Sequence, residues 1–157
     1  MQIANRQKGF TLIEVLVVIG ILAVLLALVL IAVNPRQHFI QANNTQRRSD
    51  ANAILNAIGS YMSQNKGQLP AGIDGTVRTI TSTAGASNIN LCTALVPTYI
   101  ADIPLDPVTG TETPAGSQCT TGGATYSSGY TVTTTGGNRV TVAAPAAENG
   151  ETISVTR

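Results

Sequence analysis

Hydrophobic and polar positions divide this 157-residue chain into three main parts. Residues 10–33 form a 24-residue apolar stretch that is interrupted only by Thr11, Glu14 and Gly20. The 19 residues from Val15 to Val33 would make a helix of roughly 28 Å, which is about the thickness of the hydrocarbon core of a bilayer. This first part therefore predicts a membrane-spanning helix.

The second part, residues 34–66, has the pattern of an amphipathic helix. Apolar residues recur at spacings of three and four, as they do on the buried face of a helix; they are Ala51, Ile54, Leu55, Ile58, Tyr61 and Met62. Pro35 predicts a bend because proline removes a helical hydrogen bond, and Gly67 is placed to end the helix. We expect one long helix from Phe10 to about Asn65, bent near Pro35, whose apolar stripe packs on the rest of the chain.

The third part, residues 67–157, predicts a β-rich domain. It holds 19 Thr and 6 Ser in 91 residues, and such residues favour strands and loops. Segments with alternating apolar residues predict an antiparallel meander of three strands, at residues 125–134, 138–144 and 152–156. Weaker signals predict a strand at 76–81 and a helical turn within 90–97. The fold class is therefore α+β, with a long N-terminal helix packed on a small antiparallel β-sheet head.

The nine residues before the apolar stretch are polar, and their only charges are Arg6 and Lys8. These cations should hold the N-terminus in the cytoplasm and place the head outside. An ordinary secretory signal peptide fits poorly, because its apolar region has 7–15 residues and ends in a small-x-small cleavage site. An uncut signal anchor explains the length and the orientation, but it does not explain Glu14.

Glu14 is the informative residue of the apolar stretch. A carboxylate in a spanning helix costs about 2.5–3.5 kcal/mol at mid-bilayer, less near the surface, and usually has a partner. Cleavage after Gly9 would create a new α-amino group on Phe10, four residues before Glu14. This amine, on the same helix or on that of a neighbouring copy, could pair with Glu14. In a bundle of such helices the pair would also set the axial stagger between copies.

The run Lys8-Gly9-Phe10-Thr11-Leu12-Ile13-Glu14, followed by Val-Leu-Val-Val-Ile-Gly-Ile-Leu, resembles the class III signal of bacterial type IV pilins and type II secretion pseudopilins. In that family a membrane peptidase cuts after the glycine, on the cytoplasmic side, and then N-methylates the new N-terminal residue. The resemblance implies that Gly9 ends the leader, that Phe10 is the methylated N-terminus and that Glu14 is the assembly carboxylate.

The resemblance also implies a pilin-like fold and a division of the chain into a cleaved leader, a transmembrane and assembly helix, an amphipathic stem and a globular head, at residues 1–9, 10–33, 34–66 and 67–157. The implied function is a structural subunit of a type IV pilus-like filament. Its expected partners are further copies or minor pilins, the prepilin peptidase/methyltransferase, the assembly platform with its ATPase, and the membrane.

Two alternatives stay open at this point. One is a pseudopilin of a type II secretion or DNA-uptake (competence) system, which has the same fold. The other, of a different class, is a single-pass anchored binding domain that does not polymerise. The expected location is the inner or cytoplasmic membrane with the head outside, followed by an extracellular pilus or a periplasmic pseudopilus.

A second local resemblance concerns residues 95–107, which read LVPTYIADIPLDP. They are similar to a segment of major pseudopilins and of many Gram-positive or lineage-unusual pilins, and in secretion pseudopilins a nearby loop binds calcium. Here the loop offers Asp106 and Glu112, whereas calcium takes six to eight oxygen ligands, and the Trp-Gly pair usual in that family is missing. A proline-rich turn that packs Tyr99 and Ile103 on the stem is the competing interpretation, so calcium is only a weak candidate cofactor.

The chain has two cysteines, Cys92 and Cys119, both in the part expected to lie outside the cell membrane. A disulfide between them is plausible for an exported domain and would add about 2–4 kcal/mol to its stability. Two unrelated thiols are the alternative. Two cysteines are too few for a structural zinc site.

Charge adds little evidence for catalysis or nucleic-acid binding. The net charge is +1, and His38 is the only histidine. No Ser-His-Asp, zinc or phosphate-loop arrangement can be assembled, so we expect no enzyme activity. The stem is basic and the head acidic, which either helps neighbouring subunits dock or gives two solvated faces. Arg47-Arg48 could meet DNA phosphates in an uptake system, but two arginines are weak evidence.

Overall fold

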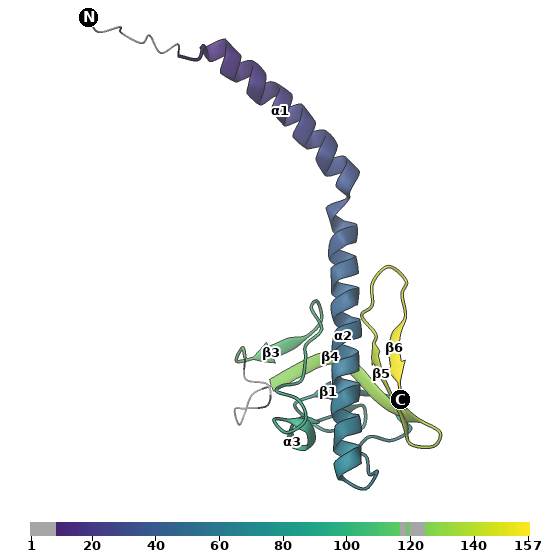
Figure 1. Ribbon diagram of the computed structural model, residues 1–157. Helices are drawn as coiled ribbons and strands as arrows, with labels where there is room; N and C mark the ends of the chain where they lie inside the picture. The colour runs from purple at the N-terminus through teal and green to yellow at the C-terminus, as the bar shows by residue number, and fades with distance from the viewer. Residues whose placement is uncertain (1–8, 117–118, 120–124) are drawn as a thin grey trace, which may run out of the picture. The chain divides into compact units, whose positions relative to one another are not determined.

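The computed structural model describes residues 9–116, 119 and 125–157 (Figure 1). The helices are α1 (Leu12–Val33), α2 (Pro35–Gln64) and α3 (Cys92–Leu95). The strands are β1 (Arg78–Thr81), β2 (Asn88–Ile89), β3 (Thr111–Thr113), β4 (Thr125–Thr135), β5 (Arg139–Ala144) and β6 (Ile153–Thr156). The chain divides into two compact units, one ending at Phe39 and the other running from Ile40 to Arg157. We call the second unit the head.

The expected continuous helix is interrupted at Asn34. This residue has a left-handed backbone conformation, with φ 44° and ψ 71°, and it ends α1. Helix α2 then begins at Pro35. Proline is well suited to the first position of a helix, because the amide hydrogen that it lacks would have no partner there. The prediction of one helix bent near Pro35 is therefore wrong in detail, since Pro35 starts a new helix.

Helix α1 is apolar on all sides. Over residues 12–31 every side chain is exposed in the isolated chain. The segment Leu12–Ile31 is the only helix in the described part of the chain that is long and apolar enough to cross a membrane. A helix that is hydrophobic all round requires an apolar environment, and α1 finds none within its own unit.

The sheet of the head has the strand order β2-β1-β4-β5-β6, and β3 pairs with β4 outside this sequence of neighbours. Strands β4, β5 and β6 form the predicted antiparallel meander. Strand β1 also pairs antiparallel with β4, whereas β2 runs parallel to β1. The sequence did not predict β2 and β3, which have only two and three residues.

Helix α2 lies across one face of this sheet within the head (Figure 1). Its predicted apolar stripe is confirmed: Ala51, Ile54, Leu55 and Ile58 are buried, and Tyr61 and Met62 pack partly buried against the same core. The sheet contributes alternating residues to the core, which are Ile80, Tyr126, Tyr130, Val132, Val140, Val142, Ala144 and Ile153. Each buried aliphatic side chain contributes roughly 1.5–3 kcal/mol to the free energy of folding. The buried residues of α2 and of the sheet thus give the head a hydrophobic core of its own.

Candidate processing and assembly site

The start of α1 is fixed by Thr11. Its backbone is extended, with φ −79° and ψ 149°, and its side chain accepts a hydrogen bond from the Glu14 amide nitrogen at 3.3 Å. The Val15 amide donates to the Thr11 carbonyl oxygen, also at 3.3 Å. The first four amide groups of a helix have no partner within the helix, and an N-cap side chain satisfies one of them. Thr11 is therefore the N-cap, and the helix begins at Leu12.

Gly9 and Phe10 lie before the helix. Neither residue has regular secondary structure, and the Phe10 side chain is 82% exposed. A β-carbon added at Gly9 would meet no atom within 4 Å. The predicted scissile bond thus lies in an open, non-helical segment. The rest of the predicted leader, residues 1–8, is outside the described residues.

Glu14 is the third residue of α1, and its side chain is exposed. The pattern Thr11-x-x-Glu14 is that of a capping box, in which the glutamate side chain reaches back toward the amide of the N-cap residue. A carboxylate in the first turn also interacts favourably with the helix dipole. The sequence analysis missed this pattern, and the structure shows one half of it, the hydrogen bond from the Glu14 amide to the Thr11 side chain. Glu14 thus lies in the first turn of α1, and Phe10 lies two residues before that helix begins.

The comparison with known families concerns this same segment. Residues 4–30 match the family model of the prokaryotic N-terminal methylation motif. The chain carries a prepilin motif of the type IV pilin and pseudopilin kind. The match spans Gly9, Phe10, Glu14 and most of α1. No curated protein and no solved structure matches the chain.

The prepilin motif defines the N-terminal segment as a substrate of the prepilin peptidase type. Such segments are typical of structural subunits rather than of enzymes. The α+β layout of the rest of the chain, a long apolar helix followed by a second helix on a mainly antiparallel sheet, is consistent with a pilin-like fold. The N-terminal helix and the motif are likewise consistent with a membrane-anchored filament subunit, at the surface or in the periplasm.

The head contains a second site of unusual chemistry, a buried polar cluster around Arg47. The Arg47 Nε donates to Asp106 Oδ2 at 2.6 Å, and both side chains are completely buried. The Arg47 Nη1 donates to Glu148 Oε2 at 3.0 Å and to Asn44 Oδ1 at 2.9 Å. Asn44 in turn donates to the Glu148 carbonyl oxygen. One guanidinium on α2 therefore holds the loops that carry Asp106 and Glu148.

The charges of this cluster stabilise each other. Burial raises the pKa of Asp106, but hydrogen bonds from Arg47 and from the backbone amides of Thr109 and Val108 outweigh it and lower the pKa to about 2. The hydrogen bond to Asp106 raises the pKa of Arg47 against the opposing effect of burial. Both groups are therefore ionised at neutral pH.

The calcium candidates do not form a cation site in the described part of the head. Both carboxylate oxygens of Asp106 are occupied, because Oδ1 accepts from the Val108 and Thr109 amides at 2.9 Å and Oδ2 accepts from Arg47. Glu112 accepts from the Gly116 amide at 2.7 Å. The described residues contain no group of three or more His, Cys, Asp or Glu that could hold a metal ion. Arg47 takes the place that a cation would have at Asp106.

Basic residues of the stem pair with acidic residues of the head within one chain, which neither of the two expectations for these charges had foreseen. Arg47 is buried, so it cannot meet DNA phosphates or the acidic head of a neighbouring subunit. Arg48 pairs with Glu151 at the surface of the same head. Arg47 and Arg48 therefore form their ion pairs with acidic residues of the same chain.

A neighbouring part of α2 extends the cluster. The Tyr130 hydroxyl donates to Asp50 Oδ2 at 2.8 Å, and the Gln46 amide donates to Asp50 Oδ1 at the same distance. Burial raises the pKa of Asp50, although these two hydrogen bonds oppose it. The sequence analysis missed Asn44, Arg47 and Asp50 as a group, although their spacing of three residues places them on one face of α2.

Two expectations for the loops of the head are confirmed. Cys92 and Cys119 form a disulfide, with their α-carbons 5.3 Å apart. Tyr99 packs on the stem, because its ring contacts that of Tyr61 edge to face at 5.6 Å and its hydroxyl donates to the Gln64 side chain. Ile103 of the same segment is also buried, with 1% of its surface exposed, and belongs to the hydrophobic core of the head.

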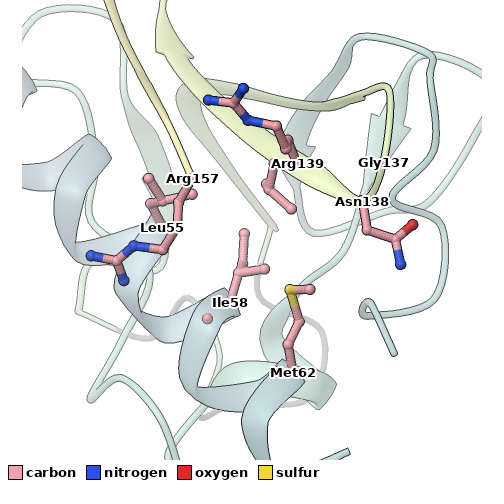
Figure 2. Close-up of a pocket in the computed structure, with 9 residues that line it drawn as sticks. Leu55, Ile58, Met62, Gly137, Asn138, Arg139 and Arg157 are labelled. Carbon is pink, nitrogen blue, oxygen red and sulfur yellow. The ribbon is translucent and has the colours of Figure 1, made fainter. Parts of the chain in front are cut away.

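A pocket of about 350 Å³ opens between α2 and the turn from β4 to β5 (Figure 2). Its apolar wall comes from α2, where Ile58 and Met62 face it, and Arg139 and Arg157 stand on the strand side. Neither arginine forms an ion pair with a carboxylate of the described residues. The chemistry of this pocket suits a group that is both apolar and negatively charged.

Proposed function

We propose that this protein is a structural subunit of a type IV pilus-like filament. It is made as a precursor, cut between Gly9 and Phe10, N-methylated at Phe10 and polymerised through α1. The observation that carries this proposal is the coincidence of the prepilin motif with the exposed start of α1, a helix whose apolar side chains have no partner within their own unit. Such a helix needs lipid first and the same helix of other copies afterwards.

Glu14 has a defined part in this assembly. Cleavage frees a positively charged amine at Phe10, and the Glu14 carboxylate of another copy is its partner in a bundle of α1 helices. An unpaired carboxylate in an apolar environment costs on the order of 2.5–3.5 kcal/mol, so pairing favours the register that brings the two groups together. The removal of the leader thus creates one half of the assembly contact.

The head remains outside the membrane as a folded domain. Its disulfide between Cys92 and Cys119 supports an oxidising location. Arg6 and Lys8 favour a cytoplasmic N-terminus before cleavage. This topology gives the precursor access to a membrane peptidase/methyltransferase at one end and to an assembly platform with its ATPase along α1.

A pseudopilin of a secretion or DNA-uptake system is the second candidate. Residues 95–107 resemble a segment of major pseudopilins and also of many Gram-positive or lineage-unusual pilins, so this segment is compatible with both candidates. Against the pseudopilin, both carboxylate oxygens of Asp106 in that segment are already engaged by Arg47 and by backbone amides. Filaments at the cell surface support the pilus, whereas loss of protein secretion or of DNA uptake on deletion, without surface filaments, supports the pseudopilin.

The test compares full-length precursors that carry Glu14→Ala, Glu14→Gln or, as a control on the same helix, Leu16→Ala. Gln keeps the shape and the capping pattern of Glu14 but removes the charge. We expect all three variants to be cleaved, and both Glu14 variants to form at least about tenfold fewer filaments than the Leu16 control. Filaments are counted by electron microscopy and cleavage is followed by intact mass.

Two results would contradict the proposal. A mature wild-type protein that still begins at Met1, or that lacks the extra methyl group on Phe10, removes the processing step. Unchanged filament numbers in Glu14→Gln would show that assembly does not need the negative charge. Helix capping would then remain as the role of Glu14.

A further inference from the structure

The backbone changes from extended to helical at Thr11, next to the proposed cleavage site. The Thr11 carbonyl already accepts a helical hydrogen bond from Val15, while its φ and ψ angles are those of an extended residue. Its side-chain oxygen accepts from the Glu14 amide. The peptide bond between Gly9 and Phe10 therefore lies outside the helix, and Phe10 itself is exposed.

This boundary matters because helices extend readily once they have formed. Each added residue gains a hydrogen bond, and the apolar side chains after Thr11 impose no local stop. Where the start of the helix enters the hydrocarbon region, an unsatisfied amide is especially costly, which favours any conformation that gives it a partner. A hydroxyl that satisfies the Glu14 amide removes one reason for the helix to extend upstream over Phe10 and Gly9.

We propose that Thr11 is a positioning residue for leader cleavage: its hydroxyl caps α1 and thereby holds the Gly9–Phe10 peptide bond in an extended segment that a peptidase can bind. A helical peptide bond has its amide and carbonyl groups engaged, whereas an extended one offers them to another protein. Hydrolysis then adds water across this bond, so that Gly9 keeps the carboxylate and Phe10 leaves with the amine. The inference rests on the proposed processing of this chain.

The polar character of Thr11 supports this role. Thr11, Glu14 and Gly20 are the only residues that interrupt the apolar stretch, and the side chain of Thr11 is directed to the backbone of its own helix. An apolar residue of the same shape would serve equally well as an anchor in lipid. The hydroxyl is therefore explained by the position of the helix start.

The test measures how fast full-length precursors are cleaved in membranes that contain the prepilin peptidase. Thr11→Val keeps the shape of the side chain and removes the hydroxyl, whereas Thr11→Ser keeps a capping hydroxyl. Loss of an N-cap typically costs about 1 kcal/mol, which changes the equilibrium between two helix starts by a factor of roughly five. We expect Thr11→Val to be cleaved roughly fivefold more slowly than the wild type and Thr11→Ser to stay within about twofold of it.

A second measurement reads the position of the helix directly. Backbone chemical shifts of the detergent-solubilised precursors should show that α1 extends over Phe10 in Thr11→Val and begins at Leu12 in the wild type and in Thr11→Ser. Slow cleavage without this extension would mean that the peptidase reads the side chain itself, and it would overturn the capping role. Equal cleavage rates for Thr11→Val and the wild type would overturn it as well.

The failure of this inference differs from the failure of the proposed function. If the wild-type precursor is not cut after Gly9, the processing itself is wrong. If the wild type is cut and the three precursors behave alike, processing stands and only the role of Thr11 is lost.

Discussion

Helix α1 and the head use their side chains in opposite ways. In α1 the large apolar side chains are more than half exposed in almost every case, as Leu22 is at 57%. In the head the large apolar residues of α2 and the sheet form a closed core, with Ile54 and Ile58 completely buried. The polar residues differ in the same way, because Arg47 and Asp106 are buried and paired, whereas Glu14 is exposed.

The contrast shows where the partners of each region lie. The Arg47 cluster and the hydrophobic core of the head find their partners within the described part of the same unit, so they account for a stable fold. The exposed apolar surface of α1 points to partners outside its own unit, such as lipid and, under the proposed function, further copies. Changes in the head should therefore alter stability, and changes in α1 should alter processing or assembly.

The largest expected effect on the head is that of Arg47→Met. It leaves Asp106 buried without its cation, and breaking a buried ion pair in this way costs about 3–5 kcal/mol. The free energy of unfolding can be measured by urea titration of the full-length chain in detergent. The signal is the near-ultraviolet circular dichroism of the four tyrosines, which all lie between positions 61 and 130.

Arg48→Met is the matched control for this prediction. The neighbouring Arg48 also pairs with an acidic residue of the head, but its side chain is 53% exposed and that of Glu151 is 38% exposed. Exposed pairs contribute 0–1 kcal/mol, typically at the lower end. Similar losses in the two variants would show that the Arg47 cluster is no more than a surface contact.

A second prediction compares one apolar residue from each region. Ile58→Ala opens a cavity in the core of the head and should lower the free energy of unfolding by about 2–5 kcal/mol. Leu25→Ala in α1, where the side chain is 53% exposed, should change it by less than about 0.5 kcal/mol. The same urea titration measures both variants. A loss above about 1 kcal/mol for Leu25→Ala would mean that α1 supports the head fold, and the comparison would fail.

The parts of the fold that could be predicted from the sequence are those with a local pattern. The stripe from Ala51 to Met62 repeats every three or four residues, and strand β5 alternates every two, so each shows its buried face directly. The break at Asn34 was not foreseen, because proline either bends a helix or starts one, and the difference depends on the residue before it. Asparagine tolerates the left-handed conformation that ends α1.

The two candidate sites differ in the same respect. Gly9, Phe10 and Glu14 lie within six residues, so their relation is visible in the sequence. Arg47 meets Asp106 and Glu148 across 59 and 101 residues, and no local pattern indicates which distant carboxylate a basic residue will find. Strands β2 and β3 were missed for a related reason, since segments of two and three residues are held by pairing with β1 and β4.

A smaller effect on the head than those of Arg47→Met and Ile58→Ala is the pH dependence that the Arg47 cluster imposes. The pKa of Asp106 is lowered from 3.8 to about 2, so its ionised form is favoured by folding. A lowered carboxyl pKa contributes stability that is present above about pH 4 and is lost as the pH falls toward 2. The contribution at neutral pH is about 2 kcal/mol. Carbon-13 shifts of the Asp106 carboxyl group should therefore titrate near pH 2 in the mature protein.

Asp50 serves as the internal control, because burial raises its pKa. Its protonated form is favoured by folding, so its contribution to stability increases as the pH falls, in the opposite sense to that of Asp106. The two carboxyl groups should titrate in the order Asp106 before Asp50 as the pH is raised. In Arg47→Met the titration of Asp106 should move upward, because burial then acts without the guanidinium. If Asp106 titrates near pH 4 in the wild type, its ion pair with Arg47 does not control its charge, and the contrast between a head paired within itself and an α1 paired outside loses its strongest example.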